Sequence, residues 1–351
     1  MARTKPSPTH LALVQLIEAL GGTATTTQVE RWQQHGWIPK TSAWREAGST
    51  RLRPEILHRA LWLASTARAG RSIGWWGWVF WAVDDTPDSA QRLRGALVAT
   101  LKRPMVRAGV ERIPTGNSNQ AFQARQDAAA RMLTNHRAPR RDLDETLRVH
   151  AAEAGLELTR SPEALPNVFH PALMDPGARL LLGGAADVGI EELLEALARA
   201  MPDNPEMIER IREAHRQAEL AGIDLLAQSP WAQGISGMVR TVERADDRIL
   251  CHAVHTCARA TFVLKALMRY APGEPEILVR LMEDVMWERW GRFAGVTPEG
   301  VPGLAALALD TFRCLADLDW AVELERYLVF MHTLLVAYPE RLGFPADRTE
   351  A

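Results

Sequence analysis

Cysteine and tyrosine are scarce in this chain, with three residues of each among 351. Cys251, Cys257 and Cys314 are an odd number and lack the close spacing of a small disulfide-stapled domain. Free thiols in a reducing compartment are therefore predicted, which favours a cytoplasmic protein over a secreted one.

Long apolar runs are also missing. The longest aromatic-rich stretch, IGWWGWVFWAV at residues 73–83, has eleven residues, whereas a membrane-spanning helix needs about 20. Near the N-terminus, Gln15 and Glu18 interrupt the apolar run that a signal peptide requires, and the apolar residues recur at helical spacing instead. We expect an amphipathic helix there and no membrane partner.

The whole chain has little net charge, −2, because two opposite halves cancel. Residues 1–141 contain 21 Lys and Arg against 9 Asp and Glu, a net charge of +12, and residues 142–351 contain 20 against 34, a net charge of −14. A basic front half attracts polyanions such as nucleic acid, and an acidic back half is repelled by the same partner. The alternative is that surface charge drifted without a function.

Helical periodicity dominates, and no segment alternates like a series of β-strands. Front-half helices are predicted near residues 9–20, 25–35, 54–69, 72–83, 88–102 and 121–135, with the fifth ending before Pro104. Back-half helices are predicted near residues 190–201, from 205 onward, and near 236–271, 275–294, 301–317 and 319–338. The predicted fold is mainly α.

The polar helix at residues 25–35 and the loop after it carry the chemistry of the front half. One of the threonines at 25–27 is expected to cap this helix, while Val29 and Trp32 face inward. The preceding helix and the turn GGTATT complete a helix–turn–helix, and residues 40–53 suit a loop or a small two-stranded wing. Side chains expected at DNA are Thr27, Gln28, Arg31, Gln34, His35, Lys40, Arg45, Arg51 and Arg53.

Four segments follow one another in the order Val29-Glu30-Arg31-Trp32, His35-Gly36-Trp37-Ile38-Pro39, Arg51-Leu52-Arg53-Pro54-Glu55 and Arg68-Ala69-Gly70-Arg71-Ser72-Ile73. This order resembles the winged helix–turn–helix of MerR-type regulators. The resemblance covers about residues 23–80. It implies DNA-facing positions at Arg31, Gln34 and Arg51, and a homodimer on a two-fold operator. The chain departs from the family at Glu30, Trp32 and Arg53, so no base contact is carried over there. An ordinary helical subdomain with solvated arginines remains the alternative.

Two further features of the front half allow more than one interpretation. The aromatic residues Trp75, Trp76, Trp78, Phe80 and Trp81 cover every face of one helix, which predicts packing within the chain, a dimer contact or a membrane-surface contact. Residues 89–141 contain eleven Lys or Arg and two acids, which predicts either an extended phosphate contact or a solvated tether.

Four prolines between Ser161 and Gly177 mark the clearest boundary in the chain. The predicted organisation is a winged helix–turn–helix domain at residues 1–85, a basic helical connector at 86–160, a Pro-rich linker at 161–177, and an acidic all-α dimerisation or effector domain at 178–345.

Two groups of residues contain side chains that can bind metal ions, and both are predicted to serve folding and packing instead of metal binding. The segment DDTPD at residues 84–88 has Pro87 inside it, so Asp84 and Asp85 are expected to end one helix, and Thr86 or Asp88 to cap the next. Asp247, Cys251 and His255 share one helical face and are the low-ranked metal candidates, because no fourth ligand is evident. No cofactor is predicted, since the Gly-rich fragments lack a phosphate-loop context.

These features together predict a non-enzymatic regulator of transcription that binds double-stranded DNA as a homodimer. The helical back domain is expected to bind a small-molecule or protein effector. Two alternatives remain open: an architectural, replication or excision protein that binds DNA, and a metal-dependent enzyme in the helical half.

Overall fold

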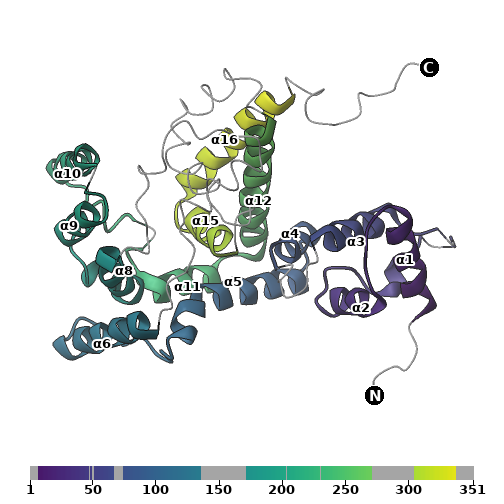
Figure 1. Cartoon of the computed structure of the whole chain (residues 1–351), viewed down its shortest axis with the longest axis horizontal. Helices are drawn as coiled ribbons and strands as arrows, with labels where there is room; N and C mark the ends of the chain where they lie inside the picture. Colours follow the sequence, from purple (N-terminus) through teal and green to yellow (C-terminus); the bar gives the residue numbers. More distant parts are fainter. Residues whose placement is uncertain are drawn as a thin grey trace. The chain divides into compact units, whose positions relative to one another are not determined.

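The computed structural model of the chain describes residues 7–46, 48–49, 51–66, 74–135, 171–202, 204–229, 231–270 and 304–336. Thirteen α-helices and two short 3-10 turns account for the regular structure of these ranges, which contain no β-strand. The predicted mainly α fold is therefore confirmed (Figure 1). No helix in the described ranges has the length and apolar character needed to cross a bilayer.

The chain divides into two compact units, which are described separately below. The first unit comprises residues 1–96 and 247–255, and the second comprises residues 97–246 and 256–351. The first division falls after Ala96, inside a helix.

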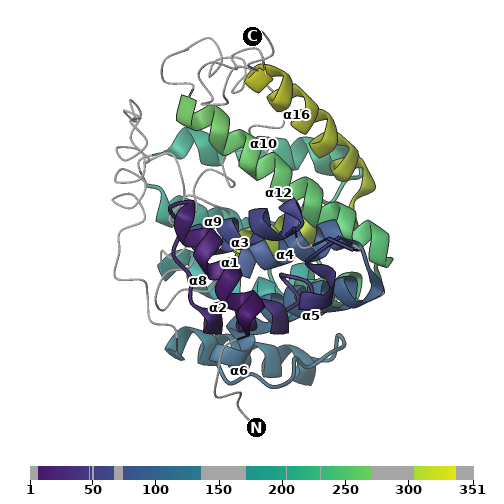
Figure 2. The same cartoon turned by 90° about the vertical axis from the view of Figure 1, so that its right-hand side faces the viewer.

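Three helices near the N-terminus build the core of the first unit: α1 (Pro8–Ala19), α2 (Thr26–Gln34) and α3 (Pro54–Thr66). α1 packs against both α2 and α3, as Figures 1 and 2 show. The largest side chains of this core are Trp32 and Trp44, of which 1% or less is exposed, and they lie among Leu13, Ile17, Val29, Ile38, Ile56 and Leu63. The spacing of Leu13 and Ile17, and of Val29 and Trp32, is the helical spacing that predicted these elements.

The aromatic segment forms α4 (Gly74–Asp84), and Phe80 from this helix joins the same core. Trp78 and Trp81 are also buried, so packing within the chain accounts for these three aromatic residues. The side chains of Trp75 and Trp76 lie outside the described residues. Gly77 is required where α4 passes Trp37, because a Cβ atom there would lie 2.1 Å from Trp37 Nε1.

The DDTPD segment ends α4 and begins α5 (Pro87–Arg107), as predicted. Asp85 has a φ of +45°, in the left-handed region, and α4 ends at the residue before it. Thr86 Oγ1 accepts a hydrogen bond from the Ser89 backbone N–H, and Ser89 Oγ accepts one from the Thr86 N–H. This reciprocal pair caps α5, so the prediction of a cap at Thr86 is confirmed.

The prediction that this helix ends before Pro104 is wrong, because α5 continues to Arg107. Proline removes one backbone donor from a helix interior. Here Leu97, Leu101 and Met105, four residues apart, are all buried, so burial of this apolar face offsets the lost hydrogen bond.

The described helices of the second unit beyond α5 are α6 (Asn119–Asn135), α8 (Pro171–Gly183), α9 (Ile190–Ala200), α10 (Pro205–Leu220), α11 (Gly234–Arg244), α12 (Asp247–Tyr270, from Thr256 onward), α15 (Leu304–Ala316) and α16 (Leu318–Val336). α8 is central, since it packs against α6, α9 and α11. α10 packs on α9, and α15 packs on α11 and α16. Beginnings of helices at Ile190 and at Pro205 after Asn204 match the prediction.

Two predicted boundaries in this unit differ from the structure. α8 begins at Pro171 and continues through Pro176, so residues 171–177 of the predicted linker are helical, while residues 161–170 lie outside the described residues. The single helix predicted near 236–271 is two helices, because Ala245 adopts an extended conformation between α11 and α12. The helix predicted at 275–294 also lies outside the described residues.

Candidate nucleic-acid interface

The N-terminus of α2 is fixed by a reciprocal cap. Thr25 Oγ1 accepts a hydrogen bond from the Gln28 backbone N–H at 3.2 Å, and Gln28 Oε1 accepts one from the Thr25 N–H at 2.7 Å. The prediction of a threonine cap is confirmed at Thr25. Gln28, which was predicted to face DNA, has its side-chain oxygen engaged in this cap.

Opposite faces of α2 differ completely in burial. Val29 and Trp32 are buried to 1% exposure or less, and they anchor the helix in the core. Thr27, Arg31 and Gln34 lie four and three residues apart and are all exposed. These three side chains therefore form one polar face of the helix, which we call the α2 outer face. Its members carry hydroxyl, guanidinium and carboxamide groups, the donors that contact phosphates and base edges.

Gln33 links α2 to two other segments through hydrogen bonds that the sequence did not predict. Its Oε1 lies 2.8 Å from His10 Nε2 on α1, and its Nε2 donates to the Pro39 carbonyl at 3.0 Å. Trp44 Nε1 donates to the same carbonyl at 2.7 Å. Since Trp44 is fully buried, these bonds fix the path of the chain from α2 to residue 44.

The segment after α2 is a 3-10 turn, η1 (Thr41–Ala43), followed by a reversal closed by one antiparallel bridge between Arg45 and Leu52. The Arg53 N–H donates to the Trp44 carbonyl at 2.9 Å beside this bridge. A two-stranded wing, one of the two predictions for residues 40–53, needs a ladder of such bridges, and the described residues of this segment form a single one. It nevertheless brings residues 45 and 52 side by side.

The basic side chains of this segment differ in whether they form ion pairs. Lys40, Arg45 and Arg51 are exposed and form no ion pair with any residue that the structure describes. Arg53 pairs with Glu55 at 2.9 Å, with about half of each side chain exposed. The charge of Arg53 is thus partly balanced, whereas the other three cations are available to an anion.

Donors from three other helices hold the C-terminal end of α2, and no sequence pattern indicated them. Trp81 Nε1 donates to the His35 carbonyl at 3.0 Å, and Arg92 Nη1 donates to the Gln34 carbonyl at 3.2 Å. Arg59 donates to the Trp37 carbonyl at 3.4 Å and forms a two-pronged ion pair with Asp84 at 2.5 and 3.1 Å. Carbonyl groups at a helix end lack intrahelical partners, so these bonds satisfy them and hold α2 against α4 and α5.

His35 lies at the same end of α2 and stacks on Trp37 with ring centroids 4.6 Å apart. Burial lowers the pKa of His35 below the usual 6.5, and the positive charges of Arg31 and Arg92 lower this pKa further. The His35 imidazole is therefore neutral at physiological pH and offers one donor and one acceptor.

Several cations of residues 89–141 are already paired. Arg92 pairs with Asp88 at 2.9 Å, Arg94 with Asp247 at 2.5 Å, and Lys102 with Glu243 at 4.0 Å. The exposed cations without an ion pair among described residues include Arg103, Arg107 and Arg112. Residues 136–141 lie outside the described ranges. Only part of the predicted basic segment is thus free to contact phosphates.

The metal candidates Asp247, Cys251 and His255 are not brought together as ligands. No group of three or more His, Cys, Asp or Glu side chains suited to a metal ion occurs in the described part of the chain. Asp247 is engaged by Arg94, and burial together with Asp85 and Asp247 raises the pKa of the Cys251 thiol to about 11. A thiol of that pKa stays protonated near neutral pH.

Within the first unit, the described residues thus present a capped, rigidly anchored helix with a polar outer face, followed by a loop with three unpaired cations. Such an arrangement can accept an extended polyanion along the helix and the loop. No protein-family model, curated protein or solved structure matches the chain.

Proposed function

We propose that the first unit binds double-stranded DNA, with the α2 outer face in the major groove and the loop after it on the phosphate backbone. The observation that carries this proposal is the exposure of Thr27, Arg31 and Gln34 on one face of a helix whose opposite face is buried at Val29 and Trp32. A groove-reading helix needs this division, because its inner face must hold it rigidly while its outer face offers donors to bases.

Electrostatics supports the same arrangement. Lys40, Arg45 and Arg51 follow α2 in the chain and are exposed, so they suit contacts with phosphates on either side of a groove. The single bridge between Arg45 and Leu52 would act as a minimal wing in a winged helix–turn–helix of the MerR type. In this proposal, Arg31 and Gln34 contact bases, and Arg51 contacts a phosphate.

The larger role that fits this chemistry is regulation of transcription in the cytoplasm, with the chain acting as a homodimer on a two-fold operator. A second candidate is an architectural, replication or excision protein that covers more DNA than one operator. Arg103, Arg107 and Arg112 in the second unit favour that candidate, since they are exposed, form no ion pair with a described residue, and would add phosphate contacts outside the first unit. Footprinting on genomic fragments separates the two: one protected palindrome supports the regulator, and extended protection supports the architectural role.

Binding of the full chain to fluorescent duplex DNA over a range of salt concentrations tests the proposal itself. Affinity should fall steeply as salt rises, because counterions are released from the duplex. Arg51→Ala should weaken binding to all sequences and reduce the salt slope by about one, and Arg31→Ala should cost about tenfold and relax sequence preference.

Arg210→Ala is the matched control. Arg210 is an exposed helical arginine of the second unit, and it forms only a loose pair with Glu206 at 3.8 Å. Its removal should leave binding unchanged. The proposal would be contradicted if the full chain did not bind duplex DNA at low salt. It would also be contradicted if Arg210→Ala reduced the affinity for DNA as much as Arg31→Ala does.

A further inference from the structure

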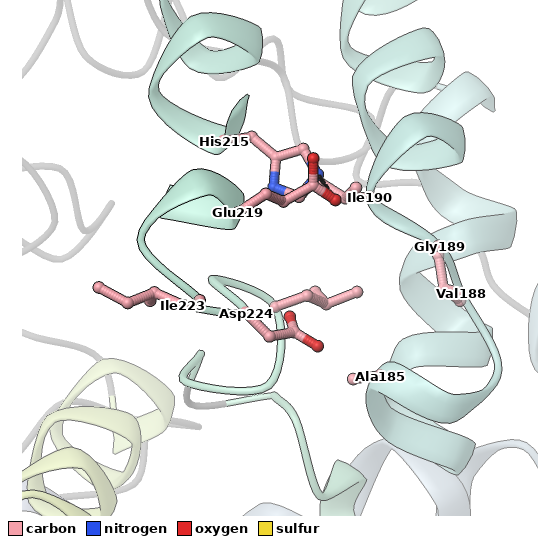
Figure 3. Close-up of a pocket in the computed structure, with 10 residues that line it drawn as sticks. Ala185, Val188, Gly189, Ile190, His215, Glu219, Ile223 and Asp224 are labelled. Atoms are coloured by element: carbon pink, nitrogen blue, oxygen red, sulfur yellow. Dashed lines mark ion pairs between the residues drawn. The ribbon is translucent and has the colours of Figure 1, made fainter. Parts of the chain in front are cut away.

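A pocket of about 470 Å³ lies in the second unit, where the end of α10 faces the turn between η3 (Gly184–Ala186) and α9 (Figure 3). Its volume falls in the range of small-molecule sites, which is roughly 300–1,000 Å³. Apolar lining comes from Val188, Ile190, Ile223 and Leu226. Its walls therefore suit the apolar body of a small molecule.

The polar groups of this pocket are acidic. Glu219 and Asp224 both line it, no lysine or arginine is among its lining residues, and their carboxylates project into the space between α10 and the turn at residues 188–189 (Figure 3). Nearby acids are balanced: Asp187 pairs with Arg125, Glu191 with Arg212, and Glu213 with Arg216. Neither Glu219 nor Asp224 pairs with a lysine or arginine of the described chain. Asp224 Oδ1 accepts a hydrogen bond from the Ala227 backbone N–H at 2.9 Å, and Glu219 is close to His215. Two carboxylates without a lysine or arginine partner in the described chain thus face one small cavity.

His215 adds a third polar group to the lining. Its side chain is only 10% exposed, and its Nε2 lies 3.4 Å from Glu219 Oε1. Its Nδ1 is buried and has no hydrogen-bond partner among the described residues. Buried ring nitrogens are normally satisfied, so His215 Nδ1 adds a polar group with unused hydrogen-bonding capacity among the described residues.

We propose that this pocket binds a small organic cation, an amine or guanidinium carried on a compact apolar body. The cationic head pairs with Glu219 and Asp224 through charge-assisted hydrogen bonds. The apolar body lies against Val188, Ile190 and Ile223. This site needs no DNA, and it goes beyond the proposed function of the first unit.

Three probes of nearly equal size and different charge test the proposal: benzylamine, benzyl alcohol and benzoate. Ligand-observed NMR titrations with the full chain, in the absence of DNA, measure each dissociation constant. Benzylamine should bind with a dissociation constant on the order of 1 mM, as expected for so small a ligand. Benzyl alcohol should bind more weakly, and benzoate should not bind detectably.

The double variant Glu219→Gln/Asp224→Asn keeps the shape of the pocket and removes its charge. It should weaken benzylamine binding roughly tenfold and leave the weak binding of benzyl alcohol unchanged, which also shows that the pocket is intact. Glu213→Gln is the matched control, because Glu213 lies on the same helix, pairs with Arg216 and does not line the pocket. Equal binding of benzylamine and benzyl alcohol, no loss in the double variant, or no binding of any probe would overturn the proposal.

Discussion

Arg125 and Asp187, 62 residues apart in the chain, form a two-pronged ion pair in the second unit with both N–O distances at 2.6 Å. Only 6% of the Arg125 side chain and 1% of the Asp187 side chain are exposed. Arg125 Nη1 also donates to the carbonyls of Pro114 and Gly116, at 3.1 and 2.9 Å. The pair therefore connects α6, the loop before it and the turn after η3 at one buried point.

Removing one partner of this pair should destabilise the second unit strongly. Asp187→Ala leaves a buried guanidinium without its counter-charge, and such changes cost about 3–5 kcal/mol. The double variant Arg125→Ala/Asp187→Ala should cost less than the sum of the two single variants, because the second change removes the unpaired charge. Urea unfolding of the four proteins measures this coupling. Additive losses would show that the two side chains act independently.

Gly77→Ala should destabilise the first unit by about 1–3 kcal/mol, the usual effect of overpacking. The added Cβ atom would lie 2.1 Å from Trp37 Nε1 and 2.5 Å from Trp37 Cε2, and a rigid indole cannot fold away from it. Gly95→Ala is the control, because Gly95 lies in α5 with nothing within 4 Å of its Cβ position. That substitution should stabilise the protein by up to about 1 kcal/mol through helix propensity. Equal free energies of unfolding for the two variants would contradict the packing of Trp37 on α4.

The three thiols should be unreactive in the folded chain. Cys251, Cys257 and Cys314 are each 3% exposed or less. A hydrogen bond with Cys314 and burial raise the pKa of Cys257, and burial raises that of Cys251 to about 11. A neutral-pH assay with a thiol-specific disulfide reagent should therefore detect little reaction in native protein and three thiols after denaturation. Rapid labelling of any thiol in the native chain would show that its helix opens readily.

The lowered pKa of His35 makes the stability of the first unit depend on pH. Between the folded pKa and the usual 6.5, the unfolded chain holds more protons than the folded chain. The free energy of unfolding should therefore decrease as the pH falls from 6.5 through the folded pKa, and no further loss is expected from this group below it. His35→Gln should flatten this dependence, as measured by urea midpoints above and below that window. An identical pH profile in both proteins would exclude this contribution.

Local patterns in the sequence predicted most helices of the described chain. The spacing of Leu13 with Ile17 and of Val29 with Trp32 predicted α1 and α2, and Thr25 and Thr86 were among the residues expected to cap helices. These signals are local, because a helix is closed by hydrogen bonds and caps within a few residues. Two errors occurred at Pro104 and Pro176, where proline predicted a break and burial of an apolar face preserved the helix. A third was the single helix predicted near 236–271, which is divided at Ala245.

For the candidate interface, the sequence predicted which residues of α2 are exposed, but not which residues hold the helix in place. Arg31 and Gln34 followed from their offset to Val29 and Trp32, since residues on one helix have a fixed angular relation. Sequence reasoning could not assign Arg92 and Arg94 to partners at Gln34 and Asp247, because those partners depend on where other segments fold. The role of Gln28 in the cap was missed although the cap is local, since Thr25 lies only three residues before it.

By itself, the sequence determined that the chain is helical, that its charge is divided between a basic front and an acidic back, and that one short helix has a buried and a polar face. Helical periodicity depends on residues a few positions apart, and charge composition is a sum over a whole segment. Both can therefore be determined from the sequence without knowing the fold. Only the tertiary structure decided which charges form an arginine–carboxylate pair, as for Arg125 with Asp187, and which have no lysine or arginine partner in the described chain, as for Glu219 and Asp224. The physical reason is that an ion pair needs two groups within about 4 Å, and that distance is set by packing between helices far apart in the chain.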